Sequence, residues 1–212
     1  MPKKRNDQLL ALDETSLAVA AETLAASDVD FAFLLATYGT PPLWAREPGF
    51  PTLVHIILEQ QVSLASARAA YNRLQAAIAP VTPERFLQLS EVELKVIGFS
   101  RQKALYVRLL AQSILAGALD LSALAELPDD EARTRLKQQK GIGDWTADIY
   151  LLMALGRPDI WPCGDLALLV ALQRLKKLPA RPTHEEFVSY GVAWKPYRAV
   201  AARLLWHFYL NS

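Results

Sequence analysis

The sequence predicts an all-α fold, and three observations carry that prediction. Nearly every segment has the spacing of apolar residues expected of a helix, and no stretch alternates convincingly as a strand would. Helix start signals recur along the chain. With 212 residues, of which 52% are hydrophobic and 21% charged, the chain can bury one large core or two small ones. We therefore expect a soluble, globular bundle of roughly ten or more helices.

Local signals place most of these helices. Pro51 suits the first turn of a helix, because no N–H group is needed there. Ser90 with Glu93 and Thr183 with Glu186 have the spacing of capping boxes, and an aspartate, Asp129, is expected to cap another helix. The predicted helices are 16–26, 31–38, 50–61, 64–78, 101–115, 144–155, 166–175 and 197–210.

Charge and cysteine content limit the kind of site. The formal net charge is +1, so any contact with nucleic acid must come from a local patch or from helix N-termini. The single cysteine, Cys163, excludes an internal disulfide and a four-cysteine iron–sulfur cluster. No apolar run is long enough to span a membrane, and the basic start 1–5 is not followed by a signal-peptide core. We expect a cytoplasmic protein with a basic tail.

The residues that could carry chemistry gather between Leu136 and Leu168. A polar segment leads into the tight turn 141–143 (Gly-Ile-Gly), an apolar helix follows, and a Gly/Pro-rich loop ends at Asp165. Glycines permit positive φ and close approach of another backbone, and the exposed N–H groups of a helix start suit a phosphate. A bare Gly-x-Gly is more often an ordinary packing corner, and a lone aspartate at a helix start is more often an N-cap. The whole composite favours a functional site.

This composite resembles the helix-hairpin-helix and the Gly/Pro-rich loop with its Asp that define the base-excision DNA glycosylase superfamily. Gly-Ile-Gly-x-Trp-Thr-Ala followed by Asp165 is most similar to the alkylpurine branch, the 3-methyladenine DNA glycosylase II type. The resemblance runs from about Phe31 to Trp206. It implies two helical lobes with the active cleft between them. The central lobe would span about 50–160, the second about 10–45 plus 165–212, with no extra N-terminal β domain.

The resemblance implies removal of alkylated bases without strand cleavage. Asp165 would stabilise the positive charge that builds on the sugar and would orient the attacking water. Bifunctional relatives carry a Schiff-base lysine where this chain has Trp145, and a tryptophan cannot form an imine. Trp145 and Trp206 match aromatic positions of the base pocket, with Trp161 as a further candidate. Leu166 follows Asp165 where close relatives can carry an aromatic residue.

Contacts with DNA are implied at two further places. A glutamine at a helix junction would fill the hole left by the flipped base. By position we favour Gln61, with Gln60 as the alternative. A Gln-Gln pair by itself is usually just the polar end of a helix. Arg101 or Lys103 would meet the DNA backbone, or belong to a solvated face. The residues expected to bind phosphate around the hairpin are Gly141, Gly143, Lys140 and Thr146.

No cofactor is implied, but hairpin carbonyls in relatives hold a monovalent cation. The candidate ligands for Na⁺ or K⁺ are the backbone oxygens of Lys137, Gln139 and Ile142. The expected partner is double-stranded DNA containing a damaged base, with no membrane, and the protein is expected to be a monomer. Near the C-terminus, Trp194-Lys195-Pro196-Tyr197-Arg198 also matches the alkylpurine branch, and Arg198 is expected to pair with an acid.

Other functions stay open. The chain could be a glycosylase for uracil, hypoxanthine or an oxidised purine. It could also be a non-catalytic module that uses the hairpin only to grip DNA phosphates. A helical scaffold with no role on DNA is the weakest of the alternatives.

Overall fold

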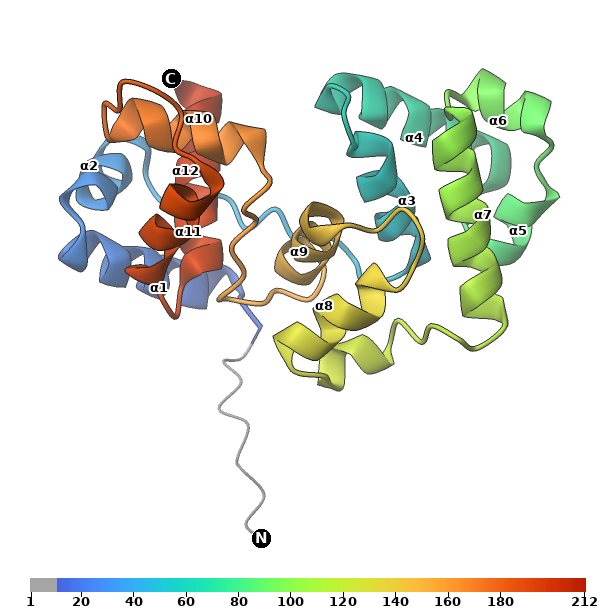
Figure 1. The fold of residues 1–212 in the computed structure, drawn as a ribbon, viewed down its shortest axis with the longest axis horizontal. Helices are drawn as coiled ribbons and strands as arrows, with labels where there is room; N and C mark the ends of the chain where they lie inside the picture. The colour runs from blue at the N-terminus through green and yellow to red at the C-terminus, as the bar shows by residue number, and fades with distance from the viewer. Residues whose placement is uncertain (1–10) are drawn as a thin grey trace, which may run out of the picture. The chain divides into compact units, whose positions relative to one another are not determined.

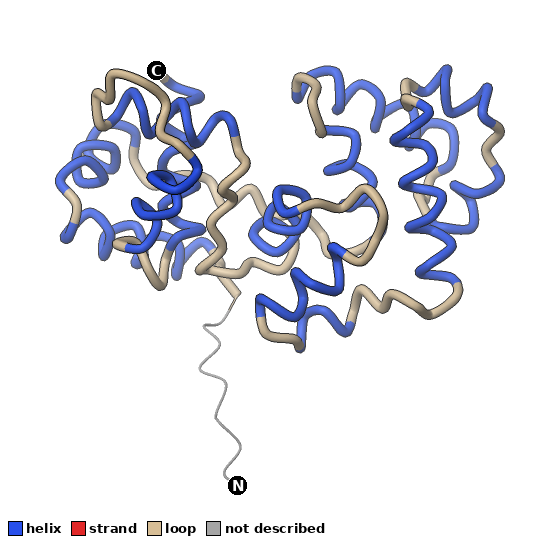
Figure 2. The backbone as a smooth tube through the Cα atoms, viewed as in Figure 1, coloured by secondary structure: helices blue, strands red, loops and turns tan. Residues whose placement is uncertain are grey.

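The structure, a computed structural model, describes residues 11–212, and the basic start 1–5 lies outside them (Figure 1). Within the described residues the chain forms twelve α-helices and one 3-10 helix, and no β-strand (Figure 2). The all-α prediction is confirmed. No helix of residues 11–212 is long and apolar enough to cross a membrane.

The helices follow one another with short connections. In chain order they are α1 (Glu14–Ser27), α2 (Val29–Tyr38), α3 (Phe50–Glu59), α4 (Leu64–Ile78), α5 (Pro83–Gln88), α6 (Glu91–Ile97), α7 (Arg101–Leu115), the 3-10 helix η1 (Ala123–Glu126), α8 (Asp129–Lys137), α9 (Asp144–Met153), α10 (Leu166–Leu175), α11 (His184–Val192) and α12 (Arg198–Asn211).

The helix caps agree with the start signals at most places. Both predicted capping boxes form. The side chains of Ser90 and Thr183 each accept a hydrogen bond from the third helical N–H, and the glutamate at that third position accepts one from the backbone N–H of the cap residue. The prediction for Asp129 is wrong. Pro128 has extended backbone and is the N-cap of α8. The helix therefore begins one residue earlier than expected, with Asp129 as its first helical residue.

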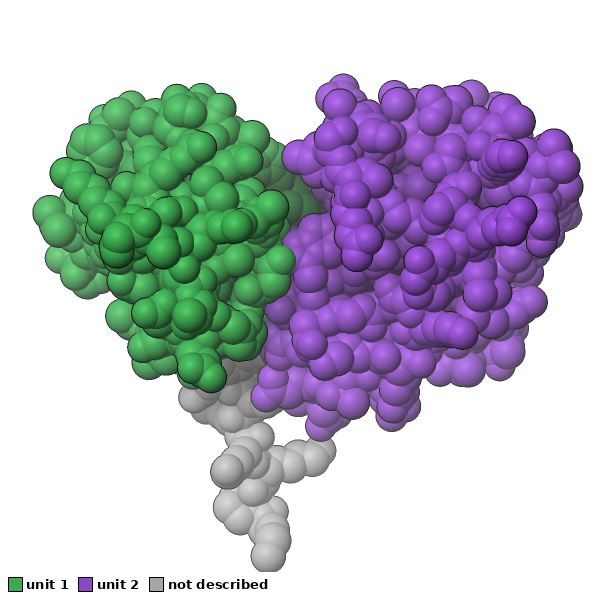
Figure 3. Space-filling view, turned by 45° about the horizontal axis from the view of Figure 1, so that its top comes forward, with its two compact units in different colours: residues 1–45, 151–212 green, residues 46–150 purple. Residues whose placement is uncertain are grey.

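Contacts divide the chain into two compact units, coloured in Figure 3. Unit 2 is Arg46–Tyr150, and unit 1 combines the described part of Met1–Ala45 with Leu151–Ser212. The lobe expected at about 50–160 therefore ends earlier than its predicted boundary. The loop after α9 is tied to unit 1, since the Gly156 carbonyl accepts from Leu12 N–H at 2.8 Å and the Pro158 carbonyl accepts from Ala199 N–H at 2.9 Å.

Unit 1 is built around α12. This helix packs against α10, α2 and α1, and every residue from Ala199 to Trp206 is buried. The expected pairing of Arg198 with an acid is confirmed, because its Nε lies 2.8 Å from Asp159 Oδ1. An aromatic cluster of Phe31, Trp161, Phe187 and Trp194 fills the same core, with Trp161 stacked on Phe187 at 4.5 Å.

Unit 2 is built around α3, whose buried side chains face α4 and α7. Three phenylalanines, Phe50, Phe86 and Phe99, meet edge to face in its core. Tyr150 near the end of the unit is fully buried, and its hydroxyl accepts a hydrogen bond from Gly49 N–H at 2.9 Å. This bond fixes the start of α3 against α9, the helix that follows the hairpin.

Candidate active site

Asp165 stands where the Gly/Pro-rich loop enters α10. It is the N-cap of that helix, is 9% exposed, and its Oδ1 accepts from Leu168 N–H at 3.0 Å. The same oxygen accepts from the indole Nε1–H of Trp206 at 3.1 Å. The residue is thus both a helix cap and a carboxylate whose orientation is set by two donors. A carboxylate fixed in this way can act on a developing positive charge without first reorganising.

Trp206 lies beside this carboxylate and Trp44 lies beside Trp206. The ring centroids of Trp44 and Trp206 are 6.3 Å apart, with an angle of 75° between the planes. Trp44 also meets His207 edge to face at 6.4 Å. The family resemblance named Trp206 as a base-pocket residue, which stays a prediction, and it did not name Trp44. Trp44 stands in the proline-rich segment that follows α2, 162 positions before Trp206 in the chain.

Arg203 holds the segment that carries Trp44. It is fully buried on α12, one turn before Trp206, and its Nε donates to the Leu43 carbonyl at 2.8 Å. Its other donors reach the carbonyls of Ala199 at 3.1 Å and Leu152 at 2.9 Å. Burial lowers the pKa of Arg203 to about 10, which still leaves the guanidinium charged at neutral pH. The peptide before Trp44 is therefore fixed to α12.

The hairpin of unit 2 needs glycine at one of its two glycine positions. Gly141 has φ +90°, and a Cβ built on it would lie 2.2 Å from two carbons of the Tyr106 ring. Gly143 has no such φ, and a Cβ there would meet nothing within 4 Å. Ile142 between them is buried. Gly141 is thus required by the fold, while Gly143 leaves space open at the surface.

The charged residues of the hairpin are at the surface. Lys140 is exposed, and Lys137 forms an ion pair with Asp144, the first residue of α9. This pair places a cation beside the acidic residue at the helix start, which partly offsets the acid's repulsion of a phosphate. In the described residues no cluster of three or more His, Cys, Asp or Glu side chains could hold a metal ion.

The two neighbouring glutamines after α3 have different environments. Gln60 is half-buried, and its Nε2 donates to the Gly141 carbonyl at 3.0 Å and to Thr146 Oγ1 at 2.9 Å. Gln61 is exposed and has φ +56°, a left-handed conformation that is uncommon outside glycine. Lys103 supports the same turn, because its Nζ donates to the carbonyls of Leu58 and Gln60, each at 2.7 Å.

This geometry changes the assignment of two residues expected at the DNA surface. The Thr146 side chain, expected to bind phosphate, is 2% exposed and its hydroxyl is engaged with Gln60. The Lys103 ammonium is engaged with backbone carbonyls, and burial lowers the pKa of this lysine. We assign both side chains to holding the turn rather than to contacting DNA.

The remaining predicted residues lie in three different settings. Trp145 is half-buried at the second position of α9, and Leu166 is 59% exposed directly after Asp165. Trp161 is 4% exposed, and its Nε1 donates to the Phe187 carbonyl at 3.0 Å. Its proposed place in a base pocket is therefore corrected: the ring packs in the core of unit 1, because α11 offers both a stacking partner and an acceptor.

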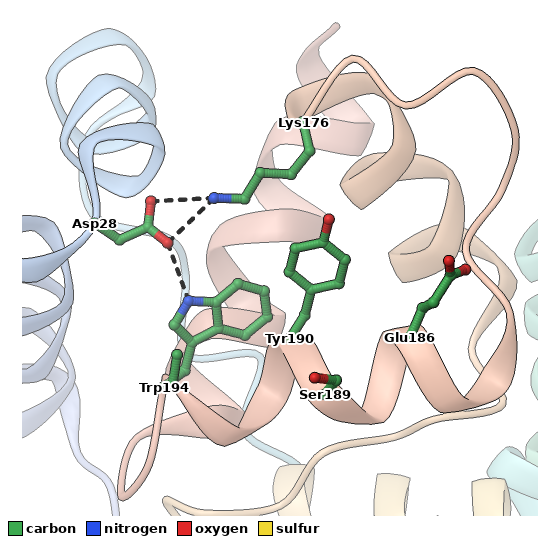
Figure 4. A pocket seen from close by; sticks show the side chains of 7 residues that line it. Asp28, Lys176, Glu186, Ser189, Tyr190 and Trp194 are labelled. Carbon is green, nitrogen blue, oxygen red and sulfur yellow. Dashed lines mark hydrogen bonds and ion pairs between the residues drawn. The ribbon is translucent and has the colours of Figure 1, made fainter.

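A surface pocket of about 360 Å³ in unit 1 lies between the start of α2, the end of α10 and α11. Its carboxylate, Asp28, accepts hydrogen bonds from Lys176 and from Trp194 Nε1 (Figure 4). Lys176 also pairs with Asp30, and Glu186 bonds back to Thr183 N–H in the capping box of α11. These charged groups are satisfied within the protein, so we assign them to holding the helices together.

Comparison with known proteins identifies the family. Residues 54–196 match the family model described as HhH-GPD superfamily base excision DNA repair protein. The chain is 29% identical over 188 residues to the putative DNA-3-methyladenine glycosylase YfjP of Bacillus subtilis (strain 168), covering 85% of this chain and 66% of that protein. It is 30% identical over 165 residues to DNA-3-methyladenine glycosylase 1 of Schizosaccharomyces pombe, covering 76% and 72%.

The solved structures agree with the sequence match. The 3-methyladenine DNA glycosylase of S. pombe, solved in complex with abasic DNA, aligns with a TM-score of 0.82 at 26% identity, over 89% of this chain and 95% of that one. The helix-hairpin-helix turn and the loop ending at Asp165 both lie within residues 54–196, which match the family model. Because the family model covers more than half of the sequence, the chain belongs to the HhH-GPD superfamily of base excision DNA repair proteins.

Proposed function

We propose that this protein is a monofunctional DNA glycosylase that flips alkylated purines, such as 3-methyladenine and 7-methylguanine, out of duplex DNA and hydrolyses their glycosidic bonds. The observation that carries the proposal is the Asp165 carboxylate, held at a helix start by Leu168 N–H and Trp206 Nε1–H. The relatives named 3-methyladenine glycosylases support the substrate class. The proposal includes a monomeric protein acting on double-stranded DNA of the nucleoid in the cytoplasm.

The chemistry follows from the position of one negative charge. Breaking the bond between sugar and base builds positive charge on the sugar, and Asp165 beside it would stabilise that state. The same carboxylate would orient the water that attacks the sugar carbon. An alkylated purine already carries positive charge and leaves easily, so little proton donation to the base is needed. One well-placed carboxylate therefore suffices for these substrates.

The absence of strand cleavage follows from the residue at position 145. A lyase step needs an amine that forms an imine with the sugar, and the indole of Trp145 cannot do so. Lys140, five residues earlier, is exposed on the hairpin, where it suits a phosphate contact. We expect the product to be an intact strand with an abasic site.

The hairpin would bind the DNA backbone, and the turn after α3 would fill the space that the flipped base leaves in the base stack. Gly143 leaves its surface open for a phosphate, and the exposed Gln61 would occupy the space left by the flipped base. A monovalent cation fits the chemistry of the hairpin carbonyls of Lys137, Gln139 and Ile142, which are oxygen ligands; the Gln139 carbonyl also accepts from Ile142 N–H at 3.1 Å. Such a cation would add positive charge facing a phosphate.

The deciding experiment is single-turnover release of base from a duplex carrying one alkylated purine, comparing wild type with Asp165→Asn. Asparagine is as good an N-cap as aspartate, so the substitution removes charge and keeps the helix start. Asp13→Asn is the matched control, because Asp13 also caps a helix of unit 1 and accepts a hydrogen bond from the third helical N–H, that of Ser16. We expect Asp165→Asn to be slower by roughly a hundredfold or more and the control to be unchanged.

The other functions give different results in the same assay. The wild-type strand must stay uncut until abasic sites are cleaved chemically, since early cleavage would mean lyase activity. Release of uracil, hypoxanthine or an oxidised purine in preference to alkylated bases would place the enzyme on another lesion. Binding to every duplex with no release of any base, by wild type or variant, would identify a non-catalytic DNA-binding module.

A further inference from the structure

We propose that Lys103 is a positioning residue for base flipping, because it holds the turn after α3 in a left-handed conformation that leaves Gln61 exposed. The inference rests on the proposed function, in which Gln61 fills the space left by the flipped base. It starts from three observations within unit 2. They are the positive φ of Gln61, the exposure of its side chain, and the two hydrogen bonds of Lys103 to the backbone just before it.

Lys103 supplies hydrogen bonds that the end of α3 lacks. The last carbonyl groups of a helix have no partner within the helix. The Nζ of Lys103, which lies on α7, donates to the carbonyls of Leu58 and Gln60, each at 2.7 Å. A cation also suits the partial negative charge at the end of a helix. Because the Gln60 carbonyl belongs to the planar peptide unit just before Gln61, Lys103 fixes the plane from which the φ rotation of Gln61 starts.

The turn is fixed at its other contacts as well. The Nε2 of Gln60 donates to the Gly141 carbonyl at 3.0 Å and to Thr146 Oγ1 at 2.9 Å, which ties the turn to the hairpin. On the far side of the turn, residue 63 is already the N-cap of α4. Only residues 61 and 62 lie between these fixed points, so the change of direction from α3 to α4 falls on them.

The conformation of Gln61 is unfavourable and serves no hydrogen bond inside the protein. Its φ of +56° is uncommon outside glycine and persists only where the surroundings impose it. The side chain is exposed, and within residues 11–212 it forms no hydrogen bond. Val62 beside it is 45% exposed. A strained residue whose side chain holds nothing inside the protein points to a partner outside it, and such a tip suits a gap in a base stack.

A purely structural role for Lys103 makes a different prediction. Lys103 could simply end α3 and stabilise the fold, and its loss would then have the same effect whichever residue occupies position 61. If Lys103 imposes the left-handed conformation, its loss should matter less when residue 61 adopts that conformation readily. Asparagine is such a residue, because it keeps the side-chain amide and is several-fold enriched at positive φ.

The test measures single-turnover release of 7-methylguanine from a duplex by wild type, Lys103→Met, Gln61→Asn and the double variant. Methionine keeps an unbranched side chain and removes the ammonium group. A left-handed residue is disfavoured by about five- to thirtyfold, so Lys103→Met should be slower by about that factor. On the Gln61→Asn background the slowing should be several-fold smaller. Lys95→Met, which removes an exposed lysine of the same unit, should leave the rate unchanged. No slowing by Lys103→Met, or the same slowing on both backgrounds, would overturn the proposal.

A binding measurement separates this inference from the proposed function. If the wild type releases no base, the proposed function fails, and affinity for two duplexes at one salt concentration then decides the role of Lys103. One duplex is intact, and the other carries a tetrahydrofuran abasic site, where the gap already exists. The wild type should bind the abasic duplex more tightly. Lys103→Met should reduce that preference by about five- to thirtyfold and keep its affinity for the intact duplex, which the hairpin supplies.

Thermal unfolding of both proteins accompanies the binding measurement. No preference in the wild type, or the same preference in the folded Lys103→Met variant, would reject a positioning role. Should Lys103→Met not fold, Lys103→Gln takes its place with the same expected outcomes, because glutamine keeps a donor but is shorter and uncharged.

Discussion

Alanine at each of the two hairpin glycines tests a different property of the turn. At Gly141 the backbone has φ +90°, and a Cβ would lie 2.2 Å from the Tyr106 ring. The strained backbone costs about 1–3 kcal/mol, and displacing the ring costs about 1–3 kcal/mol more. Their sum, about 2–6 kcal/mol, corresponds to a melting temperature lower by about 4–24 °C in a protein of this size. At Gly143 neither term applies, so stability should change by less than about 0.5 kcal/mol.

The measurements are thermal unfolding and affinity for an undamaged duplex at one fixed salt concentration. Gly143→Ala should unfold like wild type but bind DNA about fivefold more weakly or worse, because its methyl group would keep a phosphate from the hairpin N–H groups, at the loss of one hydrogen bond. Gly141→Ala should show the lower melting temperature. If Gly143→Ala binds DNA as tightly as wild type, the open surface at Gly143 is not where DNA approaches. If Gly141→Ala melts with wild type, the reasoning from strain and contact fails.

Two further predictions concern the turn after α3 and the acid limit of stability. Gln60→Ala should lower the free energy of unfolding by about 1–3 kcal/mol, since it leaves the buried Thr146 hydroxyl and the Gly141 carbonyl without their donor. Gln61→Ala should leave the free energy of unfolding unchanged and slow base release. The reverse pattern would make Gln60 the residue that fills the space left by the flipped base. Burial acts to raise the pKa of Asp28, but hydrogen bonds from Trp194 and Asp30 N–H and the charge of Lys176 outweigh it and hold the pKa below its usual value. A carboxyl group whose pKa is lower in the folded state than in the unfolded state stabilises the fold at pH values above its unfolded-state pKa. That stabilisation is lost as the pH falls through its folded-state pKa. Asp28→Asn should therefore narrow the difference in melting temperature between pH 7 and pH 3, and an unchanged difference would contradict this.

The helices were predictable because their signals are local. Apolar spacing and the capping boxes at Ser90 and Thr183 involve residues within a turn or two of one another, so the sequence states them directly. The same locality explains the error at Asp129. An aspartate before an apolar run is a good cap signal, but the extended backbone of Pro128 takes the cap position one residue earlier.

The surroundings of Asp165 were only partly predictable, because they depend on residues far apart in the chain. The loop motif points to Asp165 itself, and the family resemblance points to Trp206. Neither indicates that Arg203 reaches the Leu43 carbonyl, a bond between residues 160 positions apart. Nor does either indicate the positive φ of Trp44. The position of Trp44 in a proline-rich loop is visible in the sequence, but sequence spacing does not predict that it contacts Trp206.

The glutamine pair shows what separates residues that look alike in sequence. Gln60 and Gln61 differ in role because the backbone changes from φ −59° at the first to φ +56° at the second. That change turns one side chain toward the hairpin and leaves the other exposed. A positive φ at a glutamine must be imposed by its surroundings, and the bonds of Lys103 to the Leu58 and Gln60 carbonyls do this from another helix. The turn is therefore specified by α3, the hairpin and α7 together, and no window of sequence around Gln61 contains all three.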